Sequence, residues 1–332
     1  FVEKWSLAAT AQTPMTGAMR VAGGNFDGMP GNEIATCTKD GVAAVSAAGK
    51  VMWRNTGGGC STPSIADVDR DGKPEIVTET RVVNGEDGTT QSMLPGGDNV
   101  AVDVTGDADL EIVTANALYD HAGTPLAMTG LPGGMVAVGD FDHDGNPEFV
   151  SMNSATHQRA VWHYDEAQLD KFEILRTGID INGTFPNTCP AGSAGSMNGG
   201  GPPTIADFNG DGTPDVAVAG GIGYAVIDGT KVLDAAVAAN QAHLWFTPTH
   251  DCSSAATGSS VFDFNGDGRA EVVYSDEHYL RVYDGTTGDV LWKTCNTTGT
   301  LIEFPVVADV DADGHADVVV AANDYSSITC PD

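Results

Sequence analysis

The sequence predicts an all-β fold, a seven-bladed β-propeller with four-stranded blades, in one domain over residues 1–332. Three observations predict it: a nine-residue acidic loop that occurs seven times, short β-branched runs beside each loop, and 42 glycines. Glycine-rich turns between short apolar runs are typical of strands joined by tight hairpins. With 41% hydrophobic residues, the chain has enough apolar material for a packed core.

The repeated loop has Asn or Asp at its first position and Glu or Asp at its ninth. Its seven copies begin at Asn25, Asp67, Asp103, Asp140, Asp207, Asp263 and Asp309. Successive copies begin 36 to 67 positions apart, which is propeller spacing with loop insertions in the longer intervals.

Four strands are expected in each repeat. In the sixth repeat, residues 272–274 follow the loop, residues 280–284 form a third run and residues 289–292 a fourth. Four antiparallel strands per repeat make one propeller blade. Tryptophans support this assignment, since three of them fall in the fourth run of their repeats and one in a third run. The fourth-run residues are Trp53, Trp245 and Trp292, and the third-run residue is Trp162.

The last blade is expected to combine both ends of the chain. After the seventh loop there is room for two more strands only, and Trp5 lies in an apolar stretch before the first repeat. We therefore expect residues 1–8 to supply the outer strand of the last blade and to close the ring.

The loop has the ligand spacing of a hard cation. Oxygen-bearing side chains stand at positions 1, 3, 5 and 9, Gly at position 6 permits a sharp turn, and position 7 adds a backbone carbonyl. Oxygen ligands in this number favour Ca²⁺ over zinc or copper. An EF-hand is not expected, because position 12 is never Glu in the complete loops and the flanks are strand-like.

Five loops are complete, and we expect about five calcium ions. Their predicted ligands are Asp67, Asp69, Asp71, Lys73, Glu75, Asp140, Asp142, Asp144, Asn146, Glu148, Asp207, Asn209, Asp211, Thr213, Asp215, Asp263, Asn265, Asp267, Arg269, Glu271, Asp309, Asp311, Asp313, His315 and Asp317.

The two remaining loops are incomplete. The third has Thr105 and Ala108 at positions 3 and 6, which leaves a sixth site at Asp103, Asp107 and Glu111 as an open alternative. The first has Met and Pro at positions 5 and 6 and is predicted to hold no ion.

Three of the loops share a five-residue core: Phe, then an acid or amide, then Gly or His, then Asp-Gly. These cores begin at Phe141, Phe208 and Phe264. Here the sequence resembles the FG-GAP or VCBS repeat family, which includes the propeller of integrin α subunits and integrin-like lectins. The resemblance covers nearly the whole chain and implies a propeller with calcium at the matching acids. Because the family includes adhesins, glycan binders and accessory propellers of lyases and phospholipases, it implies no single function.

Charge narrows the choice of partners. The formal net charge is −31, from 46 acidic and 15 basic residues. Such a chain repels nucleic acid and anionic lipid, and no run of 18 apolar residues predicts membrane insertion. Bound calcium would offset part of the charge.

Six cysteines, none in a CxxC pair, indicate disulfides in an oxidising compartment. An extracellular or cell-surface location is therefore expected. Several pairings are possible, and neighbouring loops and late strands favour Cys37–Cys60, Cys189–Cys252 and Cys295–Cys330.

No catalytic motif is found, so an enzyme is not expected. The favoured function is binding of a glycan or an extracellular protein, with Asp276, Tyr279 and Tyr325 as expected contacts in polar loops. Two alternatives are open. The first is a calcium-dependent polysaccharide lyase or the accessory propeller of such a lyase, and the second is a structural spacer in a surface protein. The chain has no initial Met or leader, so a mature product and a piece of a longer extracellular protein are both open.

Overall fold

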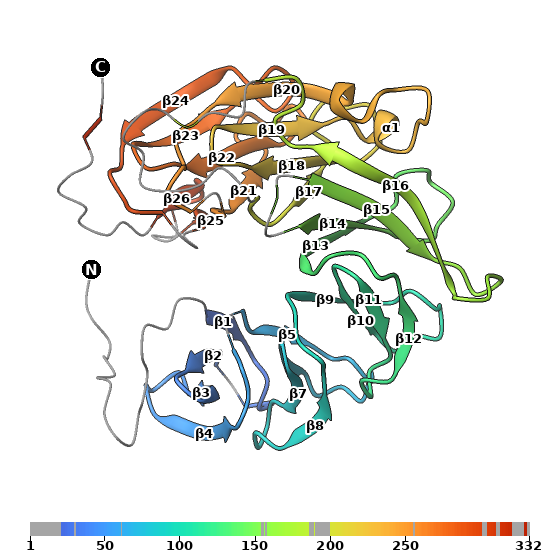
Figure 1. The fold of residues 1–332 in the computed structure, drawn as a ribbon. Helices are drawn as coiled ribbons and strands as arrows, with labels where there is room; N and C mark the ends of the chain where they lie inside the picture. Colours follow the sequence, from blue (N-terminus) through green and yellow to red (C-terminus); the bar gives the residue numbers. More distant parts are fainter. Residues whose placement is uncertain are drawn as a thin grey trace. The chain divides into compact units, whose positions relative to one another are not determined.

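A computed structural model shows an all-β protein (Figure 1). It describes residues 21–29, 31–60, 62–153, 156, 158–185, 189, 200–254, 256–300, 304–309, 313–320 and 329–330. The chain divides into two compact units, Phe1–Gly130 and Leu131–Asp332.

The first unit holds three four-stranded antiparallel sheets, each with its strands in chain order. The strands are β1 (Val21–Gly24), β2 (Glu33–Thr38), β3 (Gly41–Val45) and β4 (Val51–Thr56); β5 (Ser64–Ala66), β6 (Glu75–Thr78), β7 (Arg81–Asn84) and β8 (Thr90–Met93); and β9 (Asn99–Val102), β10 (Glu111–Thr114), β11 (Ala117–Tyr119) and β12 (Pro125–Met128).

The second unit holds three more such sheets and one two-stranded sheet among the described residues. Its elements are β13 (Gly134–Gly139), β14 (Glu148–Asn153), β15 (Gln158–Tyr164) and β16 (Phe172–Asp180); β17 (Thr204–Ala206), β18 (Asp215–Ala219), β19 (Gly223–Ile227), α1 (Gly229–Val232), the 3₁₀ turn η1 (Ala239–Gln241) and β20 (His243–Pro248); β21 (Ser259–Phe262), β22 (Glu271–Ser275), β23 (Tyr279–Tyr283) and β24 (Val290–Cys295); and β25 (Val306–Ala308) with β26 (Asp317–Val319).

The core of each unit lies between successive sheets. The second strands, such as β18 and β22, are buried along their whole length, because their Val-rich sequences pack on both faces. Val42 of β3 shares a cluster with Ile76 of β6, and Val226 of β19 shares one with Val272 of β22. Sheets that pack face to face in chain order are the blades of a propeller.

Tryptophans of the outer strands join neighbouring blades. Trp53 in β4 donates from Nε1 to the carbonyl of Gly85, at 2.7 Å, in the turn between β7 and β8. Trp245 in β20 donates in the same way to Gly285, at 2.6 Å, in the turn between β23 and β24. A Cβ at Gly88 or Gly288 would lie within 2.6 Å of the indole that covers that turn. Glycine is therefore needed where the indole lies on the turn.

The predicted all-β propeller architecture is confirmed, and six blades have the expected four strands. Trp53, Trp245 and Trp292 lie in fourth strands and Trp162 in a third, as expected. The sequence did not predict α1 and η1, which occupy the connection between β19 and β20. Residues 1–8, expected to close the ring, lie outside the described residues, so closure and the single domain stay predictions.

Candidate metal centres and binding loops

The acidic loops join the first and second strands of the blades. The loop at 67–75 connects β5 to β6, and the loop at 140–148 connects β13 to β14. In each case the ninth residue is also the first residue of the second strand, where burial by the sheet begins. Most of the turn residues are exposed, so the first six loops have an open outer rim and a buried floor, whereas Asp317 of the seventh loop is half-buried.

The floor of each loop is the carboxylate at position 9. It is 0–3% exposed in the first six loops and accepts a hydrogen bond from the amide of position 2. The pairs are Phe26–Glu33 (3.2 Å), Val68–Glu75 (2.9 Å), Val104–Glu111 (2.7 Å), Phe141–Glu148 (2.8 Å), Phe208–Asp215 (3.0 Å) and Phe264–Glu271 (2.8 Å).

The rim is shaped by glycine at position 6. In the five complete loops this glycine has φ between 85° and 90°, and its amide donates to the carboxylate of position 1. The pairs are Gly72–Asp67 (3.1 Å), Gly145–Asp140 (3.1 Å), Gly212–Asp207 (2.9 Å), Gly268–Asp263 (2.9 Å) and Gly314–Asp309 (2.9 Å).

In the second and fourth loops, buried oxygens remain that have no hydrogen-bond partner among the described residues. They are Asp67 Oδ1, Asp140 Oδ1 and Glu148 Oε1. The basic group beside Glu148 Oε1 is His163 Nδ1, at 3.9 Å. A buried carboxylate oxygen that accepts no hydrogen bond is costly, so these oxygens have the chemistry of cation ligands.

The carboxylates of these two loops converge. One oxygen each from Asp67, Asp69 and Asp71 lie within 4.8 Å of one another, and so do oxygens of Asp140, Asp142 and Glu148. Three hard oxygens this close, on a loop that offers a further carbonyl, fit Ca²⁺. Like charges at this distance repel when no cation lies between them.

The pKa values of the floor carboxyls reflect this environment. Burial, opposed by the position-2 amide and reinforced by the other loop acids, raises the pKa of Glu75 and of Glu148 to about 7. The pKa of Asp215 is raised to about 6, again mainly by burial. Burial also raises the pKa of Glu271. Without a cation these groups therefore hold their protons at pH values where ordinary carboxyls are ionised.

An amide occupies position 3 in the fifth and sixth loops. Asn209 Nδ2 donates to Asp211 Oδ2 at 3.0 Å, and Asn265 Nδ2 donates to Asp267 Oδ2 at 3.2 Å and to Glu271 Oε1 at 3.1 Å. These two loops carry three carboxylates instead of four, and the amide offsets part of their repulsion. In the seventh loop, Asp311 lies outside the described residues.

In the incomplete third loop, the floor carboxylate accepts hydrogen bonds from a residue of the same loop. Both oxygens of Glu111 accept hydrogen bonds inside the loop, because the Thr105 hydroxyl lies 3.3 Å from Oε1 and the Thr105 amide 3.0 Å from Oε2. Donors of the protein thus occupy the positions from which Glu111 would ligate an ion. The possible sixth site, at Asp103, Asp107 and Glu111, fits calcium less well than the complete loops.

Replacing Ala108 with Gly is expected to stabilise the protein by about 1 kcal/mol. Ala108 has φ 86°, the conformation of the position-6 glycines, and a Cβ is strained there. The check is the unfolding free energy in denaturant with calcium chelated. Gly72→Ala is the matched control, since its new Cβ would meet no atom within 4 Å and only the backbone effect remains. It should destabilise by a similar amount, and a shift of the same sign in both variants would contradict the argument.

Position 4 links some loops to the next blade. Arg70 and His143 adopt φ of 54° and 60°, where the other loops mostly have Gly. Arg70 Nε donates to the carbonyl of Ala108 at 2.7 Å, and His143 Nε2 lies 3.3 Å from the hydroxyl of Thr213. The strained backbone is offset by a contact between neighbouring loops.

At the opposite ends of the blades lie the loops between second and third strands. Asp276, an expected ligand contact, is fully buried there. Its carboxylate pairs with Arg281 and accepts amides of His250 (3.0 Å), His278 (2.9 Å) and Tyr279 (2.8 Å). Asp276 was expected to contact a ligand from an exposed loop. In the structure its carboxylate is buried, offers no exposed oxygen and instead stabilises the conformation of the loop.

Tyr279 is partly exposed, and two cations lie close to its ring. Arg281 Cζ and Lys293 Nζ are each 4.8 Å from the ring centroid. A tyrosine held this way is a rigid flat surface for a ligand. Tyr325 lies outside the described residues.

Three side chains that the sequence did not bring together meet beside this loop. His250 Nδ1 lies 2.6 Å from Glu277 Oε2, and the rings of His250 and His278 are 4.6 Å apart. One ligand atom from each of the three lies within 4.8 Å of the other two. His250 and Glu277 are 27 positions apart in the sequence, and the whole sixth acidic loop lies between them, so no local motif could have indicated this group.

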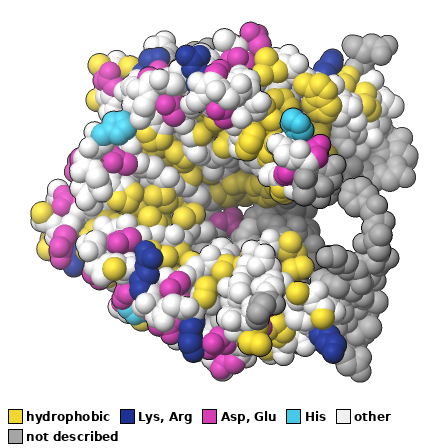
Figure 2. Space-filling model, turned by 180° about the vertical axis from the view of Figure 1, so that it is seen from behind, with side chains coloured by type: hydrophobic (Ala, Val, Ile, Leu, Met, Phe, Trp, Pro, Cys, Tyr) yellow, Lys and Arg dark blue, Asp and Glu magenta, His cyan; other side chains and the backbone are white. Residues whose placement is uncertain are grey.

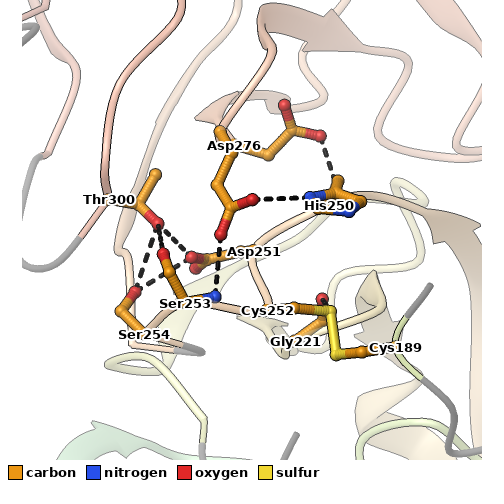
Figure 3. The surroundings of a disulfide bond; sticks show 10 residues. Cys189, Gly221, His250, Asp251, Cys252, Ser253, Ser254, Asp276 and Thr300 are labelled. Carbon is orange, nitrogen blue, oxygen red and sulfur yellow. Dashed lines mark hydrogen bonds and ion pairs between the residues drawn. A yellow bond between two sulfur atoms is a disulfide. The ribbon is translucent and has the colours of Figure 1, made fainter. Parts of the chain in front are cut away.

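Asp251 anchors the same region beneath the surface. It is fully buried, with Oδ1 accepting from Ser254 and Thr300 and Oδ2 from Tyr274, and it lies beside the Cys189–Cys252 disulfide (Figure 3). Burial raises the pKa of Asp251 to about 6 against these hydrogen bonds.

All three expected disulfides are confirmed. Cys37–Cys60, Cys189–Cys252 and Cys295–Cys330 have Cα–Cα distances of 5.3, 6.0 and 5.8 Å. In the space-filling view, acidic side chains are spread over the visible face among few Lys and Arg (Figure 2). Within the described part of the chain, no helix has the length and apolar character to cross a bilayer.

Comparison with known proteins supports the repeat and the fold. Residues 263–320, which span the sixth and seventh acidic loops, match the model of the FG-GAP-like repeat, so the predicted resemblance is confirmed. A search of curated protein sequences gives no match.

Among solved structures, the chain is similar to the biofilm matrix protein Bap1 of V. cholerae, with 17% identity, TM-score 0.68, and coverage of 92% of this chain and 74% of that one. It is also similar to BamB from Moraxella catarrhalis, with 12% identity, TM-score 0.51, and coverage of 88% and 78%. The rhamnogalacturonan lyase PL11 of Bacillus licheniformis has 17% identity, coverage of 93% and 57%, and a TM-score of 0.39. At these identities the first two likenesses show the fold alone, and the third supports no argument about catalysis.

Proposed function

The chain carries FG-GAP-like repeats in a propeller fold, and we propose that it is an extracellular, calcium-stabilised binding module. The calcium proposal rests on three buried loop oxygens that have no hydrogen-bond partner in the part of the chain that the structure describes: Asp67 Oδ1, Asp140 Oδ1 and Glu148 Oε1. A bound cation would satisfy these oxygens and remove the repulsion between the carboxylates around them.

Each complete loop would hold one ion with the same kind of ligands. Side chains at positions 1, 3 and 5 and the floor acid at position 9 supply carboxylate or amide oxygens. The carbonyl of position 7 would be the backbone ligand, at Lys73, Asn146, Thr213, Arg269 and His315. Calcium would supply structural cross-links between the first two strands of the blades, since binding to a folded site adds to the stability of the fold.

The three disulfides support an extracellular location, because such bonds persist in oxidising compartments. The similarity to a biofilm matrix protein agrees with this proposal. The net charge of −31 keeps nucleic acid and anionic membranes out of the proposed partners.

The binding surface is proposed at the blade ends opposite the calcium loops. There Tyr279 presents a ring held by two neighbouring cations, and polar loops are fixed by the Cys189–Cys252 and Cys295–Cys330 disulfides. Loops on a rigid frame are where binding usually occurs, and prior ordering lowers the entropy lost on binding. The proposed ligand is a glycan or an extracellular protein.

A glycan array probed with the labelled chain, with and without calcium, tests this function. We expect binding in calcium that Tyr279→Ala weakens about tenfold, because a stacked ring contributes on the order of 1–1.5 kcal/mol. Calcium content and melting temperature should stay near wild type. Tyr164→Ala, on another blade of the same unit, is the control for losing a tyrosine. Equal losses in both variants, or no bound glycan or protein at all, would leave the spacer role as the better explanation.

A further inference from the structure

Two histidines and a glutamate from separate segments meet where the fifth and sixth blades adjoin. His250 follows β20, whereas Glu277 and His278 lie in the turn between β22 and β23. His250 Nδ1 is 2.6 Å from Glu277 Oε2, and the two histidine rings are 4.6 Å apart. One ligand atom of each residue lies within 4.8 Å of those of the other two. Two imidazoles and a carboxylate at this spacing are a ligand set for a transition metal.

The histidine content separates this group from the other clusters in the described part of the chain. The clusters that contain Asp67 and Asp140 consist of carboxylates alone, and the one around His163 has a single histidine. Hard oxygen ligands favour Ca²⁺, whereas imidazole ligands favour Zn²⁺ and the neighbouring transition metals. The group also lies at the ends of the blades opposite the acidic loops, so an ion bound here is separate from those of the loops.

The buried carboxylate of Asp276 fixes the backbone that carries both histidines (Figure 3). It accepts the amide of His250 at 3.0 Å and the amide of His278 at 2.9 Å. The amide of Glu277 donates to the carbonyl of His250 at 2.9 Å, and the Cys189–Cys252 disulfide anchors the chain two residues after His250. Groups that are not ligands therefore hold the three ligand residues in place, which lowers the entropy lost when an ion binds.

Hydrogen bonds also orient the ligand side chains. His278 Nδ1 lies 2.6 Å from the carbonyl of Thr329, so Nδ1 carries the proton and Nε2 keeps the lone pair that a metal needs. Glu277 Oε1 accepts the amide of Ser253 at 2.7 Å, and Oε2 is the oxygen beside His250. The side chain of His250 is 25% exposed and that of Glu277 is 7% exposed, so an ion can reach the group from solvent.

We propose that His250, Glu277 and His278 bind one Zn²⁺ ion. A tetrahedral zinc ion with bonds of about 2.0–2.1 Å has ligand atoms roughly 3.4 Å apart, so side-chain shifts on the order of 1 Å close the group around it. The ion replaces the proton shared by His250 and Glu277, and that proton is released to solvent. Three protein ligands leave the fourth position open to water or to a donor atom of a ligand. The rings of His278 and Tyr279 are 6.4 Å apart, which puts the ion beside the proposed binding surface. This inference goes beyond the proposed function and does not depend on it.

Calorimetric titration of the full, oxidised chain with ZnCl₂, in an excess of calcium that fills the acidic loops, tests the site. We expect one equivalent of zinc that calcium does not displace. His278→Ala should weaken zinc binding about 100-fold or more, because loss of an outer partner of a ligand alone costs about 10–100-fold. Glu277→Gln keeps an oxygen for the Ser253 amide, so it should fold like wild type and bind zinc at least about tenfold more weakly. His121→Ala, which removes a histidine paired with the single carboxylate of Asp109, is the control and should keep wild-type affinity.

Zinc-dependent melting separates a metal ligand from a residue that only supports the fold. Saturating zinc should raise the melting temperature of wild type and of His121→Ala, and should leave that of His278→Ala unchanged. The proposal is overturned if wild type binds no zinc in excess calcium, if calcium displaces the zinc, or if His278→Ala and His121→Ala bind zinc equally. Calcium content is measured in parallel, and a chain that binds zinc but no calcium would refute the proposed function alone.

Discussion

Chelating calcium is expected to lower the melting temperature by more than about 10 °C, and added calcium should restore it. Each ion bound at 100 times its dissociation constant adds about 2.7 kcal/mol of stability, and the chain has five complete loops. Removing the ions also leaves unpaired buried oxygens at Asp67, Asp140 and Glu148. Differential scanning calorimetry with excess chelator, and metal analysis of the same samples, measures both quantities.

A matched pair of variants ties the effect to the loops. Asp140→Ala removes the first ligand of a complete loop and should lower the bound calcium by one equivalent. Asp103→Ala changes the same position of the third loop, where Thr105 already satisfies Glu111, and should leave the calcium content unchanged. An unchanged melting curve after confirmed metal removal would refute the calcium proposal.

The chelated protein is expected to become less stable as the pH rises from about 4.5 to about 7. Glu75 and Glu148 have pKa values raised to about 7, and Asp215 to about 6, so the folded state binds more protons than the unfolded state in this range. Stability from such groups is complete below the unfolded pKa and is lost as the pH passes the folded pKa. Together the three protonated carboxyls contribute on the order of 3 kcal/mol to the free energy of unfolding, after allowance for solvent screening, and this contribution is lost over the range.

Calcium should reverse this pH dependence, because it binds the ionised carboxylates and stabilises them. The difference in melting temperature between calcium-loaded and chelated protein should therefore widen between pH 5 and pH 7 and level off above. Glu148→Gln, which cannot ionise, should flatten the chelated curve, with Glu173→Gln on exposed β16 as the control. A chelated protein that gains stability over this pH range would show that the floor carboxyls are ionised without metal.

Local patterns predicted most of the fold. The acidic loops mark the turn between the first and second strands, and Val-rich runs such as those of β18 and β22 can be buried only as central strands. The Cys189–Cys252 pair followed from blade order, because both cysteines were expected in entry loops of neighbouring blades. The other two pairs were expected to join a late strand to a nearby entry loop; Cys295 ends the fourth strand β24, whereas Cys37 lies in the second strand β2. The helical connection between β19 and β20 was missed, since short helices stabilised by tertiary contacts have weak sequence signals.

The binding residues were less predictable, because burial and pairing depend on distant segments. The sequence around Asp276 predicts an exposed loop acid, yet in the structure Arg281 and three backbone amides surround its carboxylate. Arg159 looks like an ordinary strand residue in the sequence, and its burial emerges only when β14, β15 and β16 pack around it. The type of residue is visible in the sequence, whereas the partner it has or lacks is a property of the fold.

The tryptophan contacts between blades also set an order of events during synthesis on the ribosome. Trp53 is made 32 residues before Gly85, and Trp245 is made 40 residues before Gly285. At translation rates of about 5–20 residues per second, roughly 2 to 8 seconds pass between synthesis of each indole and synthesis of the β-turn that it contacts. A growing chain thus carries an uncovered tryptophan for a time after β4 and again after β20 has been made. A chaperone that binds exposed aromatic residues would have two such occasions to bind this chain during its synthesis.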